Sequence, residues 1–215
     1  MPRSPDSARA NLISAGERLF AERGIDNVSL REISRASGAR NVVALQHHFG
    51  DREGLLTAIL QKHRDRVGGR RHVLLDAYEL AGRPDLEAFA TALVEPLAAC
   101  LVDEDGGRDF LQIWADLVVR PRPTRWLGME NGREDSMERW RRLGDPLLAS
   151  SQKRVHRRYS AVVYVVTELA RRAQDPAPFD VEIVANQTID VVMSILSAPV
   201  RAKTASLLEL HTHQL

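Results

Sequence analysis

Cysteine is almost absent from the chain. The 215 residues include one cysteine, Cys100, so no intrachain disulfide bond can form, which is typical of proteins from a reducing cytoplasm. Cys100 lies in the apolar segment 93–102 (LVEPLAACLV). We therefore expect it to be a small buried side chain and not a redox sensor.

Long hydrophobic runs are also missing. No apolar run approaches the ~20 residues that a transmembrane helix needs. The first residues, MPRSPDSAR, contain no apolar segment of the kind found in a secretion signal. These two absences predict a chain that does not enter a membrane and that stays in the cytoplasm.

The common motifs of catalysis are not found. The sequence has no glycine loop for phosphates, no zinc-ligand spacing and no nucleophile elbow. His47 and His48 are adjacent, so on a helix they point in different directions and cannot easily share one metal. We therefore expect no enzymatic activity, no metal site and no cofactor.

Charge is nearly balanced in total but unevenly distributed. The formal net charge is +1, yet residues 1–71 hold 13 Lys and Arg against 8 Asp and Glu, a net charge of +5, and the remainder carries −4. This asymmetry is typical of a basic DNA-binding head on a body that does not bind DNA. The hydrophobic content of 44% is enough for a sizeable core.

The pattern that is most informative about structure lies between positions 29 and 49. Ser29 and Glu32 have the spacing of a capping box, and Val28 and Ile33 that of a hydrophobic staple. They predict a short helix that begins at Ser29. Gly38 should end it in a left-handed turn, which glycine enters at little steric cost.

A second short helix is expected to begin at about residues 39–41 and to end near residue 48. Its apolar residues recur every three to four positions, at Ala39, Val42, Leu45 and Phe49. Two short helices around a glycine turn form a helix-turn-helix, whose second helix reads the major groove of DNA. The alternative is an ordinary pair of helices that serves packing alone.

Residues 10–60 as a whole resemble the N-terminal domain of the TetR family of transcriptional regulators. The resemblance covers about a quarter of the chain, and its elements occur in order at the family's spacing. The matching positions are Leu19, Phe20, Glu22, Gly24, Ser29, Glu32, Ile33, Gly38, Leu45, His48, Phe49, Glu53 and Leu55.

Three positions depart from the family pattern. Gln46 replaces the tyrosine that usually contacts a phosphate in this family, and it offers a hydrogen-bond donor without an aromatic ring. Arg52 replaces the family's lysine and keeps the charge. The segment from Gly38 to Phe49 is one residue longer than the common pattern, and the extra residue falls within 40–43.

The side-chain types suggest a division of work on DNA. Arg grips guanine through two bonds, Asn and Gln do the same to adenine, and apolar side chains contact the thymine methyl group. The expected base readers are Arg40, Asn41, Val43 and Ala44. The expected phosphate contacts are Ser29, Arg31, Gln46, His47 and Arg52.

The rest of the chain predicts further helices. We expect the helix that starts after Asp51 to break or kink at Gly68-Gly69, because each interior glycine costs ~1 kcal/mol relative to alanine. A helix with a kink at Pro96, a helix over 108–120 and an irregular segment over 120–132 should follow. A helix from about residue 133 should bend at Gly144 and Pro146 and continue to about residue 153.

The last two predicted helices, about 155–173 and 180–199, carry the strongest apolar signal of the body. In the second helix the apolar stripe is too wide for a helix that exposes one face to solvent. In the TetR family the corresponding pair forms a four-helix bundle with a second subunit, so the resemblance implies a homodimer. The alternative is that other helices of the same subunit cover this surface.

The resemblance also implies a small-molecule cavity in the body. The candidate walls are Tyr78, Phe89, Phe110, Trp114, Trp126, Trp140, Tyr159 and Tyr164, although any one aromatic residue is more commonly part of a plain core. The candidate polar anchors are Asp116, Arg120, His156 and Asn186.

The sequence thus predicts an all-α protein with a three-helix helix-turn-helix head (residues 1–50) on a larger helical ligand-binding and dimerisation body (51–215). We expect a homodimer that binds a palindromic operator in double-stranded DNA and represses transcription until a small-molecule effector releases it. An activator, or a regulator without a ligand, fits the same sequence. The alternative of another class is a helical ligand-binding or adaptor protein without specific DNA binding.

Overall fold

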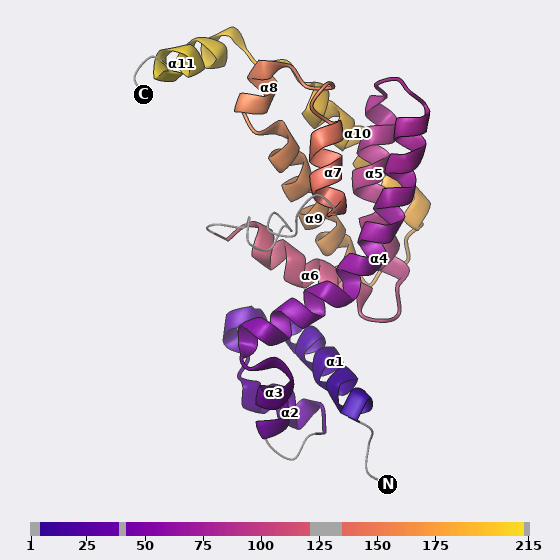
Figure 1. The fold of residues 1–215 in the computed structure, drawn as a ribbon, viewed down its shortest axis with the longest axis vertical. Helices are drawn as coiled ribbons and strands as arrows, with labels where there is room; N and C mark the ends of the chain where they lie inside the picture. The colour runs from indigo at the N-terminus through magenta and orange to yellow at the C-terminus, as the bar shows by residue number, and fades with distance from the viewer. Residues whose placement is uncertain (1–4, 39–41, 121–134, 213–215) are drawn as a thin grey trace.

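The computed structural model describes residues 5–38, 42–120 and 135–212, and within these ranges every regular element is a helix. The all-α fold expected from the sequence is confirmed. Figure 1 shows a small N-terminal unit, here called the head, below a larger helical body. The head consists of α1 Pro5–Arg23, the 3-10 helix η1 Ile25–Asn27, α2 Leu30–Ala36 and α3 Val43–Phe49.

The body begins with the 29-residue helix α4, which runs from the head to the far end of the body (Figure 1). Helix α6 lies across the junction and packs against α1. The body helices are α4 Arg52–Leu80, α5 Leu86–Ala98, η2 Ala99–Val102, α6 Gly107–Val118, α7 Ser136–Leu143, α8 Ser150–Arg154, α9 Arg157–Gln174, α10 Val181–Ser197 and α11 Ala202–Thr212.

Helix α4 is continuous through Gly68 and Gly69, so the break predicted there is wrong. The buried residues Val67, Arg71 and Leu75 recur every four positions across the glycines. Their packing outweighs the intrinsic cost of the two glycines. Gly68 also has a steric role, because a Cβ at this position would lie 3.3 Å from the hydroxyl oxygen of Ser136.

The single bent helix predicted from residue 133 to residue 153 is also wrong, because the structure has two helices, α7 and α8. Proline at 146 has no N–H and disfavours helical geometry in the residue before it. Gly144 closes α7 directly against the ring of Phe89, where no Cβ fits. Trp140 stacks on that ring at a centroid distance of 4.4 Å and donates to the Phe89 carbonyl at 2.9 Å.

Pro96 is accommodated near the end of α5, which changes to a 3-10 helix three residues later. The carbonyl oxygen of Pro96 accepts a weak hydrogen bond from the Cys100 thiol, whose sulfur lies 3.8 Å away. Burial raises the pKa of Cys100 to about 12. Cys100 is therefore a buried, protonated core side chain, as its apolar surroundings in the sequence predict.

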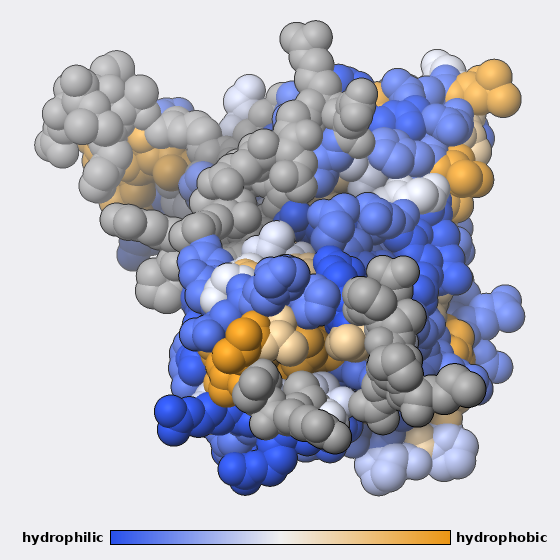
Figure 2. Space-filling model, turned by 60° about the horizontal axis from the view of Figure 1, so that its bottom comes forward, coloured by the Kyte–Doolittle hydropathy of each residue, from blue (hydrophilic) through white to orange (hydrophobic). Residues whose placement is uncertain are grey.

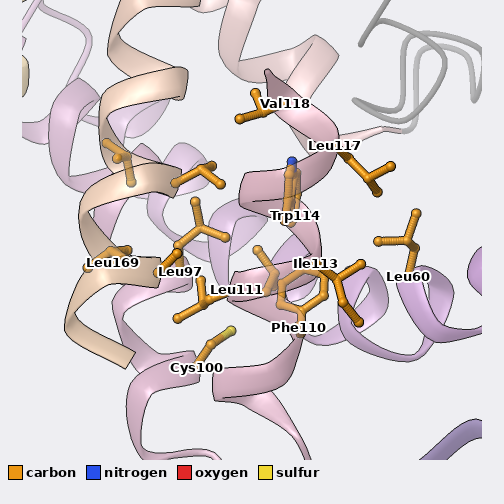
Figure 3. Close-up of a cluster of buried hydrophobic side chains, with 14 of the residues drawn as sticks. Leu60, Leu97, Cys100, Phe110, Leu111, Ile113, Trp114, Leu117, Val118 and Leu169 are labelled. Carbon is orange, nitrogen blue, oxygen red and sulfur yellow. The ribbon is translucent and has the colours of Figure 1, made fainter. Parts of the chain in front are cut away.

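The body core gathers around α6. Figure 3 shows α6 placing one face into a cluster of apolar side chains that also receives Leu60 from α4 and Leu169 from α9. The α6 residues of this face are Phe110, Leu111, Ile113, Trp114, Leu117 and Val118, each at most 5% exposed. The spacing of these apolar residues is the pattern from which the helix over residues 108–120 is correctly predicted.

The predicted C-terminal pair corresponds to α9 and α10, with boundaries that differ by one or two residues. Helix α11 is not predicted from the sequence, and Figure 1 shows it extending away from the body. Within the described ranges no single helix is long and apolar enough to span a membrane. Only α10 combined with Ala202–Leu210, which meet at a 56° bend, reaches that length and composition together.

Candidate nucleic-acid interface

The first helix of the helix-turn-helix, α2, begins with the capping box that the sequence predicts. The Ser29 hydroxyl accepts the Glu32 amide at 3.3 Å, while a carboxylate oxygen of Glu32 accepts the Ser29 amide at 2.8 Å and its hydroxyl at 2.7 Å. The Ser29 bonds, followed by the bond from Arg23, lower the pKa of Glu32 to about 2. The Ser29 hydroxyl is therefore already engaged in the cap.

The second helix, α3, is anchored by one side and exposed on the other. Leu45 is 0% exposed, whereas Val43 is 63% exposed. Gln46 and His47 are also exposed, and Ala44 is half-buried. Because residues three and four positions apart share a helix face, Val43, Gln46 and His47 form one exposed face, here called the reading face. Such a face has the size and side-chain types that fit a major groove.

Helix α2 carries two exposed arginines. Arg31 and Arg35 are both exposed and lie four positions apart, so they share a face of α2. Arg31 is one of the phosphate contacts predicted from the sequence, whereas Arg35 is an additional candidate. The four-residue spacing of the two arginines is the signal that identifies it. Figure 2, in which the head comes forward, shows a small hydrophobic patch among hydrophilic side chains.

Arg52 is held within the head. One terminal nitrogen donates to the Asp26 carbonyl at 3.3 Å and the other to the Val28 carbonyl at 2.8 Å. The start of α4 is thereby tied to the connection between α1 and α2, and Asp51 caps α4 by accepting the Gly54 amide at 2.9 Å. The charge of Arg52 still contributes to the potential of the head, but both of its terminal nitrogens already have partners.

Two of the predicted base readers, Arg40 and Asn41, lie outside the described residues, as does the predicted cavity wall Trp126. The same holds for Ala39 of the expected apolar stripe and for most of the irregular segment expected over 120–132. Gly38 does adopt the left-handed conformation, with φ 75°. The predicted turn between the two helices is therefore present.

Of the predicted cavity residues, Trp114 lines a cavity of about 520 Å³ between α4, α6 and α7. Phe89, Phe110 and Trp140 are each 0% exposed and pack with one another or with neighbouring apolar side chains. Tyr78 is buried and Tyr164 is half-buried. These aromatic residues act as core, which is the alternative that the sequence left open.

The predicted polar anchors lie away from this cavity. Arg120 bonds Asp116 at 2.7 Å and also Asp26 of the head at 2.9 Å. His156 and Asn186 are exposed. Tyr159 is 42% exposed and donates to the Val118 carbonyl at 3.0 Å. The Arg120 bridge therefore joins α6 to the head, a role that the sequence does not reveal.

Comparison with known proteins agrees with this geometry. Residues 12–59 match the model of a family described as bacterial regulatory proteins, tetR family. Over 91 residues the chain is 33% identical to the HTH-type transcriptional repressor KstR2 of Rhodococcus jostii, covering 42% of this chain and 44% of that protein. Over 63 residues it is 32% identical to the repressor AcnR of Corynebacterium glutamicum, covering 29% and 33%. The chain thus spans less than half the length of these curated relatives.

The fold of the whole chain is shared more widely than the sequence. The crystal structure of NalD, the secondary repressor of the MexAB-OprM efflux pump in Pseudomonas aeruginosa, matches with a TM-score of 0.56 at 20% identity. This match covers 91% of this chain and 98% of that one. The resemblance that the sequence indicates is confirmed over residues 12–59, which match the model of the tetR family of bacterial regulatory proteins.

Proposed function

We propose that the protein is a sequence-specific repressor that binds a palindromic operator in double-stranded DNA as a homodimer and is released by a small molecule. The observation that carries the proposal is the exposed reading face of α3, which lies within the family-matched residues 12–59. Two curated relatives of this segment are transcriptional repressors. We place the boundary between head and body at residues 50 and 51, and the protein in the cytoplasm.

We assign Val43 and Ala44 to the bases, together with Arg40 and Asn41. Contacts to phosphates come from Arg31 and Arg35 on α2 and from Gln46 and His47 at the edge of the reading face. Ser29 and Arg52 support these contacts from the capping box and from the bonds within the head. This division follows the chemistry of the side chains, because base-edge contacts specify sequence and phosphate contacts set position.

A gel shift tests the proposal. The purified protein is mixed with DNA fragments flanking its own gene at physiological salt with excess non-specific competitor. A discrete complex on one palindromic fragment supports it. A failure on every fragment, together with weak binding that does not fall as salt rises, favours the alternative of a helical ligand-binding or adaptor protein.

Arg31→Ala and Arg35→Ala should each weaken binding to operator and random DNA alike. Each change should also reduce the slope of log K against log salt by roughly 1, because one phosphate contact is lost. Fluorescence anisotropy at four salt concentrations measures both effects. Arg83→Ala, an exposed arginine of the body, is the matched control and should change neither. An unchanged salt slope in both head variants would remove α2 from the interface.

For the dimer we propose the outer face of α10. Ile183 is 57% exposed and Val191 38% exposed, with exposed Gln187 between them at four-residue spacing. The opposite side of α10, including Val184, Val192 and Leu196, is buried within the subunit. Apolar residues on both sides of one helix support a second covering surface, and a partner copy supplies it.

Ile183→Asp combined with Val191→Asp should convert the dimer to a monomer, because it places two charges in an apolar interface. Light scattering after size-exclusion chromatography measures the mass. The affinity for a palindromic operator should fall by at least tenfold, since two heads no longer bind as one unit. Leu80→Asp, at a residue that is 90% exposed, is the control and should leave the mass unchanged. A double variant that keeps the wild-type mass would place the interface elsewhere.

A further inference from the structure

The cavity between α4, α6 and α7 contains a buried cation with an unused donor. Arg71 is 1% exposed. Its Nε donates to the Ala92 carbonyl at 3.1 Å, and its Nη1 donates to the Ser136 hydroxyl at 2.9 Å. Its Nη2 is buried and has no hydrogen-bond partner among the described residues. Both acceptors are uncharged, so neither of them neutralises the guanidinium.

A second unused donor lines the same cavity. The indole of Trp114 is 5% exposed, and its Nε1 is buried without a partner within residues 5–38, 42–120 and 135–212. Figure 3 shows this nitrogen at the end of the ring that points away from Phe110. An indole N–H donates only, so it requires an acceptor. Two residues that line one cavity, Arg71 on α4 and Trp114 on α6, thus each carry a buried donor without a partner.

Burial of an uncompensated charge is strongly unfavourable, and proteins normally pair such a group or bond it fully. Burial lowers the pKa of Arg71 to about 10, and the charge of Asp135 opposes this shift only in part. An anion with two acceptor oxygens would satisfy both unpaired donors, those of Arg71 and Trp114.

The remaining walls restrict what that anion can be. The volume of about 520 Å³ lies within the range of roughly 300–1,000 Å³ typical of small-molecule sites. Val67 and Met137 provide apolar contact. Asp65 and Asp135 also line the cavity, and both are already engaged, Asp65 with Gln61 at 2.6 Å and Asp135 with the N-terminus of α7. Their charges oppose a dianion more strongly than a monoanion, and the lining also contains a second arginine, Arg64.

We propose that this cavity binds a small monocarboxylate with an apolar remainder, whose two oxygens accept from Nη2 of Arg71 and Nε1 of Trp114. The proposal deepens the proposed function by naming the effector class, and it rests on that function only for its regulatory consequence. Binding itself is independent of DNA.

The position of the cavity connects it to the head. Helix α4 lines the cavity with residues 61–72 and begins in the head, where Arg52 is bonded to Asp26 and Val28. Helix α6 supplies Trp114, and Arg120 beyond its end is bonded to Asp26. A ligand that changes the separation of α4 and α6 therefore shifts the two elements that hold the head.

The experiment uses the full chain without DNA and a panel of probes: octanoate, dodecanoate and 3-phenylpropanoate, with 1-octanol and octyl phosphate as matched controls. At a concentration 100 times its Kd, a binding carboxylate should raise the Tm by roughly 5–10 °C. Trp114→Phe keeps the ring and should raise the Kd about tenfold. Arg71→Met should abolish the rise for every carboxylate.

The proposal is overturned if 1-octanol stabilises as well as octanoate, if octyl phosphate binds more tightly than every carboxylate, or if no carboxylate raises the Tm. It is also overturned if Arg71→Met and Trp114→Phe respond as the wild type does. A gel shift with and without the best carboxylate then tests regulation separately. A carboxylate that binds but leaves the DNA complex intact supports the site and contradicts release, whereas absence of any specific DNA complex contradicts the repressor function alone.

Discussion

Leu45→Ala should lower the free energy of unfolding by about 2–5 kcal/mol, the range for removing a fully buried leucine from a packed core. Leu45 is 0% exposed and is the one buried residue of α3. Its seven-residue helix is too short to be stable without packing. For a chain of this size the loss corresponds to a fall in Tm of roughly 5–15 °C. Differential scanning calorimetry measures it directly.

The same variant should also lose specific DNA binding, although Leu45 itself does not contact DNA. Leu45 points into the head, so its removal leaves the reading face chemically unchanged but no longer fixed. A change in position of about 1 Å is enough to disrupt a hydrogen-bonded interface. We therefore expect the operator affinity to fall by at least a hundredfold, with little change in weak, non-specific binding.

Val43→Ala is the matched control, because Val43 is on the same helix and 63% exposed. It should change the Tm by no more than about 2 °C, since exposed substitutions cost little. It should nevertheless alter the discrimination among operator variants, because it removes an apolar contact to a base. Equal losses of stability in the two variants would contradict the assignment of inner and outer faces of α3.

The two faces of α3 illustrate what the sequence determines locally. The capping box at Ser29, the turn at Gly38 and the anchor Leu45 follow from short-range spacing, because each depends on residues within four positions. The same reasoning failed at Gly68-Gly69. There the outcome depends on the packing of the buried residues on either side of the glycines, among them Arg71, which bonds to the hydroxyl of Ser136 far away in the sequence. The helix propensity of a residue carries no information about such long-range contacts.

The body site shows the same limit. Most of the aromatic residues predicted as cavity walls are part of the core, and the pattern of aromatic residues does not point to Arg71. Arg71 follows Val67 and precedes Leu75 at four-residue spacing on the buried side of α4. A charged residue within such an apolar stripe is a signal that could have been used. Which of its donors would lack a partner depends on the packing of α7 and could not be read from the sequence.

Glu17→Ala should produce the second large effect, a loss of about 3–5 kcal/mol in the free energy of unfolding, typical of removing one partner of a buried ion pair. Glu17 is 2% exposed in α1. One of its carboxylate oxygens contacts Nε2 of His63 and the other accepts from Lys62 at 3.0 Å. Gly106 in the turn before α6 lies so close to this carboxylate that no Cβ fits. Glu17 therefore joins α1 to α4 and to the start of α6.

Exposed pairs on the same helix provide the comparison. Glu22 pairs with Arg18 at 3.6 Å, with both side chains about half exposed. Glu22→Ala should therefore change the free energy of unfolding by less than about 0.5 kcal/mol. Chemical denaturation of the two variants under identical conditions separates the buried network from the surface pair. A similar small loss in both would show that the Glu17 contacts contribute little.

A double-mutant cycle determines whether the loss arises from the contact itself. Glu17→Gln keeps the shape of the side chain and removes its charge, and His63→Gln removes the ring that stacks on Phe110 at 4.5 Å. If the two side chains act as one unit, the double variant should be more stable than the sum of the single losses predicts, by about 1–3 kcal/mol. Additive losses would assign each residue to separate packing. Because His63 lies on α4 four residues before Val67 of the cavity wall, a measured coupling would show that α1 of the head is joined to the same face of α4 that carries Val67.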